Sequence, residues 1–340
     1  MSLYLYEVVC KFSAQSSNYF AMLKLVAYSI SLSLLLFSLT YILLEINQDI
    51  DQVGEGVENP RHVIVYLVHS KHQKSLAMSL IGLFKNFNRR FRKTVVIFHE
   101  SDFKAKLFLN DLMKFSFFTK NDFKLFKFVE VSFHLSPKFI AKHGQNSTNF
   151  VPVFHHVFPG YHHVINFWFQ QVFSIPAMRK VTYFWRLDSD SQLTAAVNYD
   201  IFTFMEDNGY IYGYRSQEYD SPLVTRGLLE FVDKFKSSNN NTTLKQYRNS
   251  QTRNEIDMPV PVPIFYNNFE IVHVPTFQYH KGIKAFNNAV EDSLKIYENR
   301  WGDAPLRYFQ ITLFFNKTKY CHHFCDISYF HQKHFKPNCN

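Results

Sequence analysis

The apolar run VIVYLV, Val63–Val68, decides the fold class, because it has the length and continuity of a strand buried on both faces. Apolar residues then recur at helical spacing over Ser75–Phe87, and a second apolar run, TVVIF, follows at Thr94–Phe98. A strand, a helix and a strand in this order predict two parallel strands joined by a crossover helix.

The same alternation continues along the chain and predicts an α/β domain. Further strands are expected around Phe126–Phe133 and at Val181–Leu187, the second of which runs directly into Asp188-Ser189-Asp190. Helices and loops are expected between and after them. The expected helices open near Ser101 and cover Tyr199–Asp207, His280–Tyr297 and Ala304–Phe315, and the expected loops are Ser237–Thr243 and Met258–Pro263.

A long uncharged stretch near the N-terminus predicts a membrane anchor. Leu25–Leu44 holds no charged residue, and at 1.5 Å per residue its helix spans about 30 Å, the thickness of the hydrocarbon core. Lys11 and Lys24 precede it and acidic residues follow, which places the N-terminus in the cytosol. A cleaved signal peptide is the alternative. The predicted organisation is a cytosolic tail (1–24), a transmembrane signal-anchor (25–44), a stem (45–61) and a luminal domain (62–340).

Composition excludes several classes of protein. Hydrophobic residues make up 46% and charged residues 19%, which rules out a disordered chain. The net charge of +9 would suit nucleic acid, anionic lipid or a phosphorylated ligand. However, the sequence has no basic run with interleaved stacking residues, so we expect no nucleic acid partner. It also contains neither of the glycine-rich phosphate-binding motifs.

The cysteines leave two interpretations open. Cys321, Cys325 and Cys339 would lie in an oxidising lumen, which permits one disulfide and one free thiol with undetermined pairing. Alternatively, these cysteines could form a structural zinc site with His331 and His334.

Asp188 and Asp190 are the first candidate site residues. They follow a predicted buried strand, and ligands of open α/β sheets bind beyond the carboxyl ends of parallel strands. Two carboxylates at this spacing can hold a hard divalent cation. Many glycosyltransferases use such a cation to stabilise the diphosphate that leaves a sugar nucleotide. The alternative is a solvated loop or a helix cap.

From about residue 62 to residue 340 the sequence resembles the fungal-type α-1,2-mannosyltransferases, glycosyltransferase family fifteen. Several separated blocks stand in the family's order at close to its spacing, which is more specific than any single block. The matching blocks are Tyr183–Asp190 (family Y-Y-W-R-V-E-P-D), Tyr199–Asn208, Asn268–Ile271 (N-F-E-I), Arg300–Pro305 (R-W-G-D-A-P), Asp326–His331 (D-[IV]-G-Y-x-H) and Asn338-Cys339.

The resemblance implies a GT-A fold, a Rossmann-like mixed sheet flanked by helices. It also implies retaining, metal-dependent transfer of mannose from GDP-mannose to a mannose-terminated acceptor in protein glycosylation or mannan synthesis. The expected cofactor is Mn²⁺ or another divalent cation. The expected location is the Golgi or ER membrane, as a single-pass type II protein with a luminal catalytic domain.

The resemblance also assigns the metal and catalytic residues. Its metal carboxylate falls on Asp188, where the family has the longer Glu, so Asp190 is a further candidate ligand. Its metal-binding histidine falls on His331, which would otherwise be read as a surface histidine. The carboxylate beneath the sugar's anomeric carbon falls on Glu270, whose alternative is a solvent-facing position on a strand. Asp303 is expected to take or orient the acceptor's proton, and its alternative is a helix N-cap.

The resemblance also assigns positions that would bind the donor and the acceptor. At one of them, His69, the sequence departs from the family. The candidates are Tyr161, Arg186, Asp220, Trp301 and His69, with a core position as the alternative for Trp301. His69-Ser70 replaces the family's Arg-Asn, and the family's Gly-Gly before the Trp-Gly-Asp block is absent. These departures raise a second possibility, a catalytically impaired descendant of the family that binds glycan or nucleotide.

Overall fold

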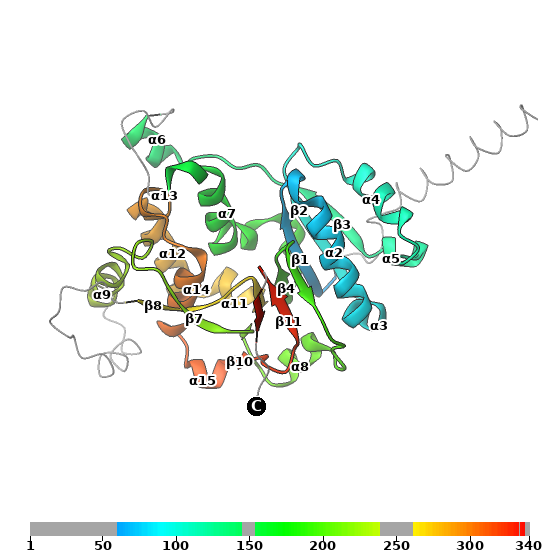
Figure 1. Ribbon diagram of the computed structural model, residues 1–340. Helices are drawn as coiled ribbons and strands as arrows, with labels where there is room; N and C mark the ends of the chain where they lie inside the picture. The colour runs from blue at the N-terminus through cyan, green and yellow to red at the C-terminus, as the bar shows by residue number, and fades with distance from the viewer. Residues whose placement is uncertain (1–59, 145–153, 239–260, 333, 337–340) are drawn as a thin grey trace, which may run out of the picture. The chain divides into compact units, whose positions relative to one another are not determined.

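The computed structural model describes residues 60–144, 154–238, 261–332 and 334–336. Its centre is a seven-stranded sheet with the strand order β10-β6-β9-β4-β1-β2-β3 (Figure 1). The strands are β1 (His62–Val68), β2 (Thr94–His99), β3 (Phe126–Glu130), β4 (Tyr183–Leu187), β6 (Tyr212–Tyr214), β9 (Phe269–His273) and β10 (Cys321–His323). All paired neighbours are parallel except that β9 runs antiparallel to β4 and β6. The predicted Rossmann-like mixed sheet is confirmed.

The first strand–helix–strand unit closely follows its prediction. The two apolar runs become β1 and β2, and the helix between them is α2 (Gln73–Leu83), which continues as the π-helical turn η2 (Phe84–Asn88). The helix predicted to open near Ser101 begins later, as α4 (Ala105–Lys114). A turn precedes it, closed by the Phe103 amide donating to the Glu100 carbonyl at 3.1 Å.

Helices cover both faces of the sheet (Figure 1). Along β1, Val63 and Val65 belong to the main hydrophobic core, with residues of α7 (Gly160–Phe169) and α14 (Asp303–Thr312). The alternate residue Tyr66 points to the other face, where its hydroxyl lies 3.1 Å from that of Ser79 on α2. Because side chains alternate along a strand, each residue of β4 and β9 can be assigned to one of these two layers.

The remaining elements surround this three-layer arrangement. They include two small sheets, β5-β11-β12 and β7-β8. Their bounds are η1 (Ser70–His72), α3 (Arg89–Phe91), α5 (Lys120–Phe123), α6 (Pro137–His143), η3 (His155–Val157), η4 (Gln171–Ser174), η5 (Pro176–Met178), β5 (Ser191–Leu193), α8 (Ile201–Asp207), β7 (Gln217–Asp220), α9 (Leu228–Ser238), β8 (Val262–Phe265), α11 (Val274–Tyr279), α12 (Lys281–Ser293), α13 (Lys295–Asn299), α15 (Lys317–Tyr320), β11 (Tyr329–His331) and β12 (His334–Lys336).

Two late predictions need correction. The helix expected at His280–Tyr297 is divided into α12 and α13, because Leu294 adopts the left-handed conformation with φ of 61°. The loop expected at Met258–Pro263 overlaps strand β8, which begins at Val262 and pairs with β7.

The predicted tail and anchor, and the stem up to residue 59, lie outside the described residues. Within the described ranges, no helix combines the length and the apolar character that crossing a membrane requires.

The cysteines do not support the zinc alternative. Cys325 is part of a disulfide, so its sulfur is not a free thiolate ligand. Cys321 is a free thiol, and burial raises its pKa to about 12. The outcome of one disulfide-bonded and one free cysteine agrees with the first interpretation.

Candidate active site

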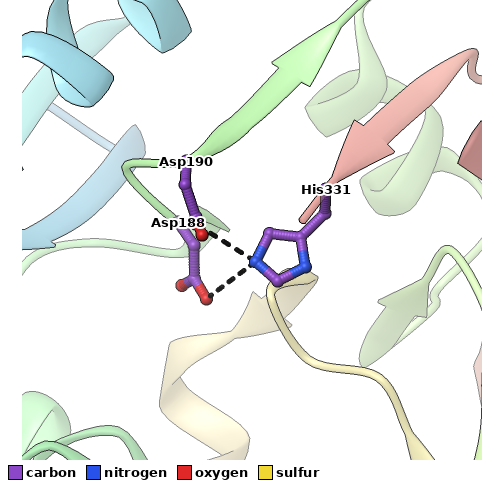
Figure 2. A group of neighbouring side chains, drawn as sticks. All are labelled: Asp188, Asp190 and His331. Carbon is purple, nitrogen blue, oxygen red and sulfur yellow. Dashed lines mark ion pairs between the residues drawn. The ribbon is translucent and has the colours of Figure 1, made fainter. Parts of the chain in front are cut away.

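Asp188, Asp190 and His331 meet at the end of β4 although His331 is distant in sequence (Figure 2). The two aspartates lie in the turn between β4 and β5, which is held by the Ser191 hydroxyl donating to the Asp188 carbonyl at 2.7 Å. Strand β11 pairs with β5 so that His331 stands opposite Ser191. This register places the imidazole beside the carboxylates, and one ligand atom from each residue lies within 4.8 Å of the others.

The geometry of this group suits a divalent cation. Nε2 of His331 lies 3.1 Å from Oδ1 of Asp190 and 3.9 Å from Oδ2 of Asp188, and it forms no well-directed hydrogen bond within the described part of the chain. The other ring nitrogen, Nδ1, lies 3.1 Å from the Tyr266 hydroxyl, the kind of contact that orients a metal-binding histidine. Two carboxylates and one oriented imidazole can therefore hold a divalent cation, and imidazole favours Mn²⁺ over Mg²⁺.

The two aspartates differ in their surroundings. Burial raises the pKa of Asp188, against the opposing effect of Arg186. The neighbouring His331 lowers the pKa of Asp190, whose side chain is more exposed. Asp190 is therefore the more readily ionised of the pair, and Asp188 depends more on a nearby positive charge.

Arg186 joins the candidate metal group, which is Asp188, Asp190 and His331, to the carboxylates of Glu270 and Asp303. Its Nε donates to Oδ1 of Asp188 at 3.2 Å, and its NH1 donates to Oδ2 of Asp303 at 2.7 Å and lies 3.7 Å from Oε1 of Glu270. The guanidinium also stacks 4.3 Å from the ring of Trp168 on α7. The structure thus brings Asp188, Glu270 and Asp303 around one buried cation.

Glu270 points into the layer formed by α7 and α14 and has no exposed surface. Its Oε2 accepts hydrogen bonds from Arg307 at 3.1 Å and Tyr212 at 3.0 Å, whereas Oε1 accepts none within the described residues. Burial raises its pKa, although Arg307 and Arg186 oppose this. The alternative of a solvent-facing Glu270 is wrong, because this residue lies on the buried face of a central strand.

The Asp303 side chain is held by hydrogen bonds from two other side chains and does not cap α14. It is the first residue of α14, whose N-cap is Gly302 without a side-chain hydrogen bond. Its Oδ2 accepts hydrogen bonds from Arg186 and, at 2.9 Å, from the side-chain amide of Asn267. The N-cap alternative for Asp303 is therefore wrong.

Tyr161 and Asp220 lie beside Asp303. Burial raises the pKa of the Tyr161 hydroxyl, although 43% of the residue is exposed, and Asp303 and Asp188 raise it further. Burial also raises the pKa of Asp220, again with a contribution from Asp303. A β-carbon added to Gly302 would lie 3.3 Å from Oδ2 of Asp220, so this carboxylate adjoins the turn that precedes Asp303.

The two remaining assigned positions, His69 and Trp301, differ in their exposure to solvent. His69 is exposed just beyond the carboxyl end of β1, and its Nδ1 accepts a hydrogen bond from the Lys71 amide. Trp301 is 1% exposed, packs on Phe231 and donates its indole N–H to the Arg226 carbonyl at 2.9 Å. This burial supports the core alternative for Trp301.

The sequence alone did not identify the residues that hold Glu270, Asp303 and His331 in place. Arg307 binds Glu270, Asn267 binds Asp303, and Tyr266 contacts His331. Arg307 left a signal, because a cation within the apolar run of α14 requires a buried anion as its partner. The asparagine and tyrosine left no signal, since their partners depend on how strands pair.

Comparison with known proteins identifies the family of this chain. A family model described as glycolipid 2-alpha-mannosyltransferase matches residues 45–340. The chain belongs to this family. The relatives of this mannosyltransferase family include the probable mannosyltransferase KTR4 of Saccharomyces cerevisiae, 32% identical over 187 residues, which are 53% of this chain and 39% of the relative. The O-glycoside alpha-1,2-mannosyltransferase homolog 5 of Schizosaccharomyces pombe is 24% identical over 314 residues, 82% of this chain and 72% of the relative.

Solved structures show that the fold is shared with this mannosyltransferase family. The mannosyltransferase Ktr4p of S. cerevisiae in complex with GDP matches with a TM-score of 0.67 and 22% identity, covering 88% of this chain and 83% of that one. Core-mannan synthase A of Aspergillus fumigatus in its Mn/GDP form matches with a TM-score of 0.65 and 21% identity, covering 82% and 76%.

Proposed function

We propose that this chain is a retaining, divalent-cation-dependent α-1,2-mannosyltransferase that moves mannose from GDP-mannose to a mannoside acceptor. Membership of the family supports this proposal, as do the Mn/GDP form of the Aspergillus relative and the GDP complex of Ktr4p. The observation that carries it is the contact of Arg186 with Asp188, Asp303 and Glu270, because a candidate metal ligand and two candidate catalytic carboxylates then share one cluster.

Asp188, Asp190 and His331 are the proposed ligands of the cation. When bound, a cation such as Mn²⁺ neutralises charge on the departing nucleoside diphosphate. Tyr266 keeps the imidazole of His331 in place, and Arg186 fixes the Asp188 carboxylate. His69, at the end of the neighbouring strand β1, is proposed to contact the donor, and Arg186 acts through the carboxylates that it positions.

Glu270 is the proposed carboxylate beneath the anomeric carbon. Positive charge develops on that carbon as the bond to the diphosphate breaks, and a carboxylate in a buried layer stabilises it strongly. Arg307 and Tyr212 fix Oε2, and Oε1, which is buried 3.7 Å from Arg186, is the oxygen that accepts no hydrogen bond within the described residues. Asp303 is proposed to accept or orient the acceptor's proton, with Tyr161 and Asp220 contacting the acceptor beside it.

The proposed setting is the Golgi or ER membrane, with the catalytic domain in the lumen. This part rests on the uncharged stretch at 25–44 and on the acidic residues that follow it.

Transfer by the purified full-length chain tests the proposal. The chain is incubated with GDP-mannose, Mn²⁺ and a panel of mannosides, and the linkage and anomeric configuration of the product are determined. We expect an α-1,2-linked product that disappears with a chelator. If a chain shown to be folded by circular dichroism transfers no mannose to any acceptor, the proposal is wrong.

A second candidate function is binding of glycan or nucleotide without turnover. Two observations favour it: Glu270 has no exposed surface, and Asp188 replaces the longer glutamate of the family. A Glu270→Gln variant separates the two functions, because it keeps the shape and removes the charge. A transferase loses activity on this change, whereas a binding protein keeps its affinity for GDP and has no activity to lose.

A further inference from the structure

A second cavity lies away from the proposed active site. Its volume is about 780 Å³, and it is bounded by the end of α7, the turn η4 and the helices α11 and α12. No proposed metal or catalytic residue lines it. Its wall is rich in side-chain amides, contributed by Asn166, Gln170, Gln171, Gln278, Asn287 and Asn288.

Helix α12 presents one polar face to this cavity. Lys284, Asn287, Asn288 and Glu291 recur at the spacing of a single helix face, and all four line the cavity. The opposite face carries the buried residues Ile283, Phe286 and Val290. Packing of the core accounts for the apolar face of α12, and the polar face is the one that borders the cavity.

One hydrogen bond fixes the orientation of each of two amides and does not use the other polar atom of that amide. The Gln278 side chain donates to the Phe173 carbonyl at 2.8 Å, and Oδ1 of Asn287 accepts from Gln310 at 2.6 Å. These two hydrogen bonds do not use Oε1 of Gln278 or Nδ2 of Asn287. An oriented acceptor and an oriented donor on one wall suit a ligand with several hydroxyl groups, each of which both donates and accepts.

An aromatic ring and charged side chains of both signs in the lining indicate the class of ligand. Tyr279 lines the cavity and is 64% exposed, and the Lys284 ammonium lies 5.8 Å from its ring centroid. An exposed aromatic ring can cover the apolar C–H face of a sugar. Two cations, Arg179 and Lys284, and one anion, Glu291, line the cavity. The Glu291 carboxylate opposes a phosphate or carboxylate ligand, so the amides and the aromatic ring favour a neutral one.

We propose that this cavity is a second saccharide-binding site that takes a neutral oligosaccharide through its amides and the ring of Tyr279. The site is separate from the proposed active site. The rings of Phe173 and Phe277 form its inner wall and flank the guanidinium of Arg307 at 5.0 and 4.7 Å, and Arg307 in turn holds Glu270. The proposal concerns binding alone and does not require that the chain transfers mannose.

Calorimetric titration of the full-length chain with α-1,2-linked mannotriose tests this site. The titration is run in chelator without nucleotide and in a His331→Ala background, so that the metal group contributes nothing. We expect Tyr279→Ala to weaken binding about tenfold, and Gln171→Ala combined with Asn288→Ala to weaken it by a similar factor. Lys281→Ala, on the same helix but outside the lining, is the matched control and should leave affinity unchanged.

Three results would overturn the proposal. The first is absence of binding heat with α-1,2-linked mannotriose. The second is binding that survives Tyr279→Ala and the double amide variant, which would place the sugar elsewhere. The third is tight binding of inorganic phosphate that is lost on Arg179→Ala, which would make the cavity an anion site. Because the readout is binding, failure of the proposed transferase activity would leave the outcome readable.

Discussion

Arg186 is the residue on which the proposed active site depends most. One guanidinium contacts three carboxylates that come from the end of β4, from β9 and from the start of α14. Arg307 also pairs with Glu270, so the three carboxylates and the two guanidiniums leave an excess of one negative charge, which a bound divalent cation would offset. The arrangement favours cation binding before the arrival of an anionic donor.

Arg307→Met should strongly destabilise the fold. The change removes the main partner of Glu270 and leaves a carboxylate buried with Arg186 at 3.7 Å, and breaking a buried pair on one side costs about 3–5 kcal/mol. Urea denaturation measures the loss. The double variant Arg307→Met with Glu270→Leu should recover part of it, because the unpaired charge is gone. If the double variant is less stable than the single one, the pair does not act as described.

Asp303→Asn should lower kcat. The amide keeps an oxygen for Arg186 and Asn267 but cannot accept a proton, and loss of a general base typically costs about 10²–10⁴-fold in rate. Initial rates across GDP-mannose concentrations give kcat and KM separately. Gln217→Ala, an exposed position on β7, serves as the control that should leave both constants unchanged. A wild-type rate for Asp303→Asn would exclude this residue as the base.

At the scale of elements, the strands that bury both faces could be predicted and the small paired segments could not. β1 and β2 contain continuous apolar runs, and β4 is apolar except for Arg186, so composition alone locates them. β5 and β11 have three residues each and no apolar pattern of their own. Their pairing, which brings His331 to the aspartates, depends on tertiary contacts. The resemblance to the family therefore supplied His331, and periodicity did not.

Glu298 should stabilise the contact between α6 and α13 in a pH-dependent way. Burial alone would raise its pKa, but hydrogen bonds from Lys142, Lys295 and His143 outweigh it and lower the pKa to about 2. The folded-state pKa lies below the usual 4.5, so this stabilisation is present above pH 4.5 and is lost as the pH falls toward 2. Glu298→Gln should cost about 1–2 kcal/mol at pH 7, a range reduced for the exposure of the lysines.

The control is the exposed ion pair between Lys138 on α6 and Asp292 on α12. Asp292→Asn should leave the free energy of unfolding unchanged at both pH values, because solvent screens an exposed pair. Thermal unfolding followed at pH 7 and at pH 3 compares the two variants. If Glu298→Gln is as harmless as Asp292→Asn at pH 7, the three hydrogen bonds do not stabilise the fold.

For the whole molecule, Mn²⁺ should stabilise the folded chain. The candidate ligands join the end of β4 to β11, so the metal group exists only when these segments are paired. A ligand that binds only the folded state at 100 times its dissociation constant adds about 2.7 kcal/mol. Thermal unfolding should shift upward with Mn²⁺ and return with a chelator. His331→Ala should abolish the shift, and a shift that persists in this variant would locate the metal elsewhere.

The whole fold could be predicted further than the site. Alternating strands and helices indicate a sheet with helices on both faces, and the strand end at Asp188 indicates where ligands bind. The lining beneath that end could not be predicted, because Arg186, Glu270 and Arg307 meet only through the register of β4 and β9 and the docking of α14. Trp301 shows the converse: its block matches the family, yet its ring is buried in the core.

The pairing of β11 with β5 has a consequence for how the protein matures. Asp188 and Asp190 emerge from the ribosome some 140 residues before His331. A nascent chain thus displays two carboxylates and no imidazole, and its affinity for manganese should remain low until β11 has docked on β5. Clipping by a protease upstream of Tyr329 would return the molecule to that state, so loss of the metal would report damage at the far end of the polypeptide.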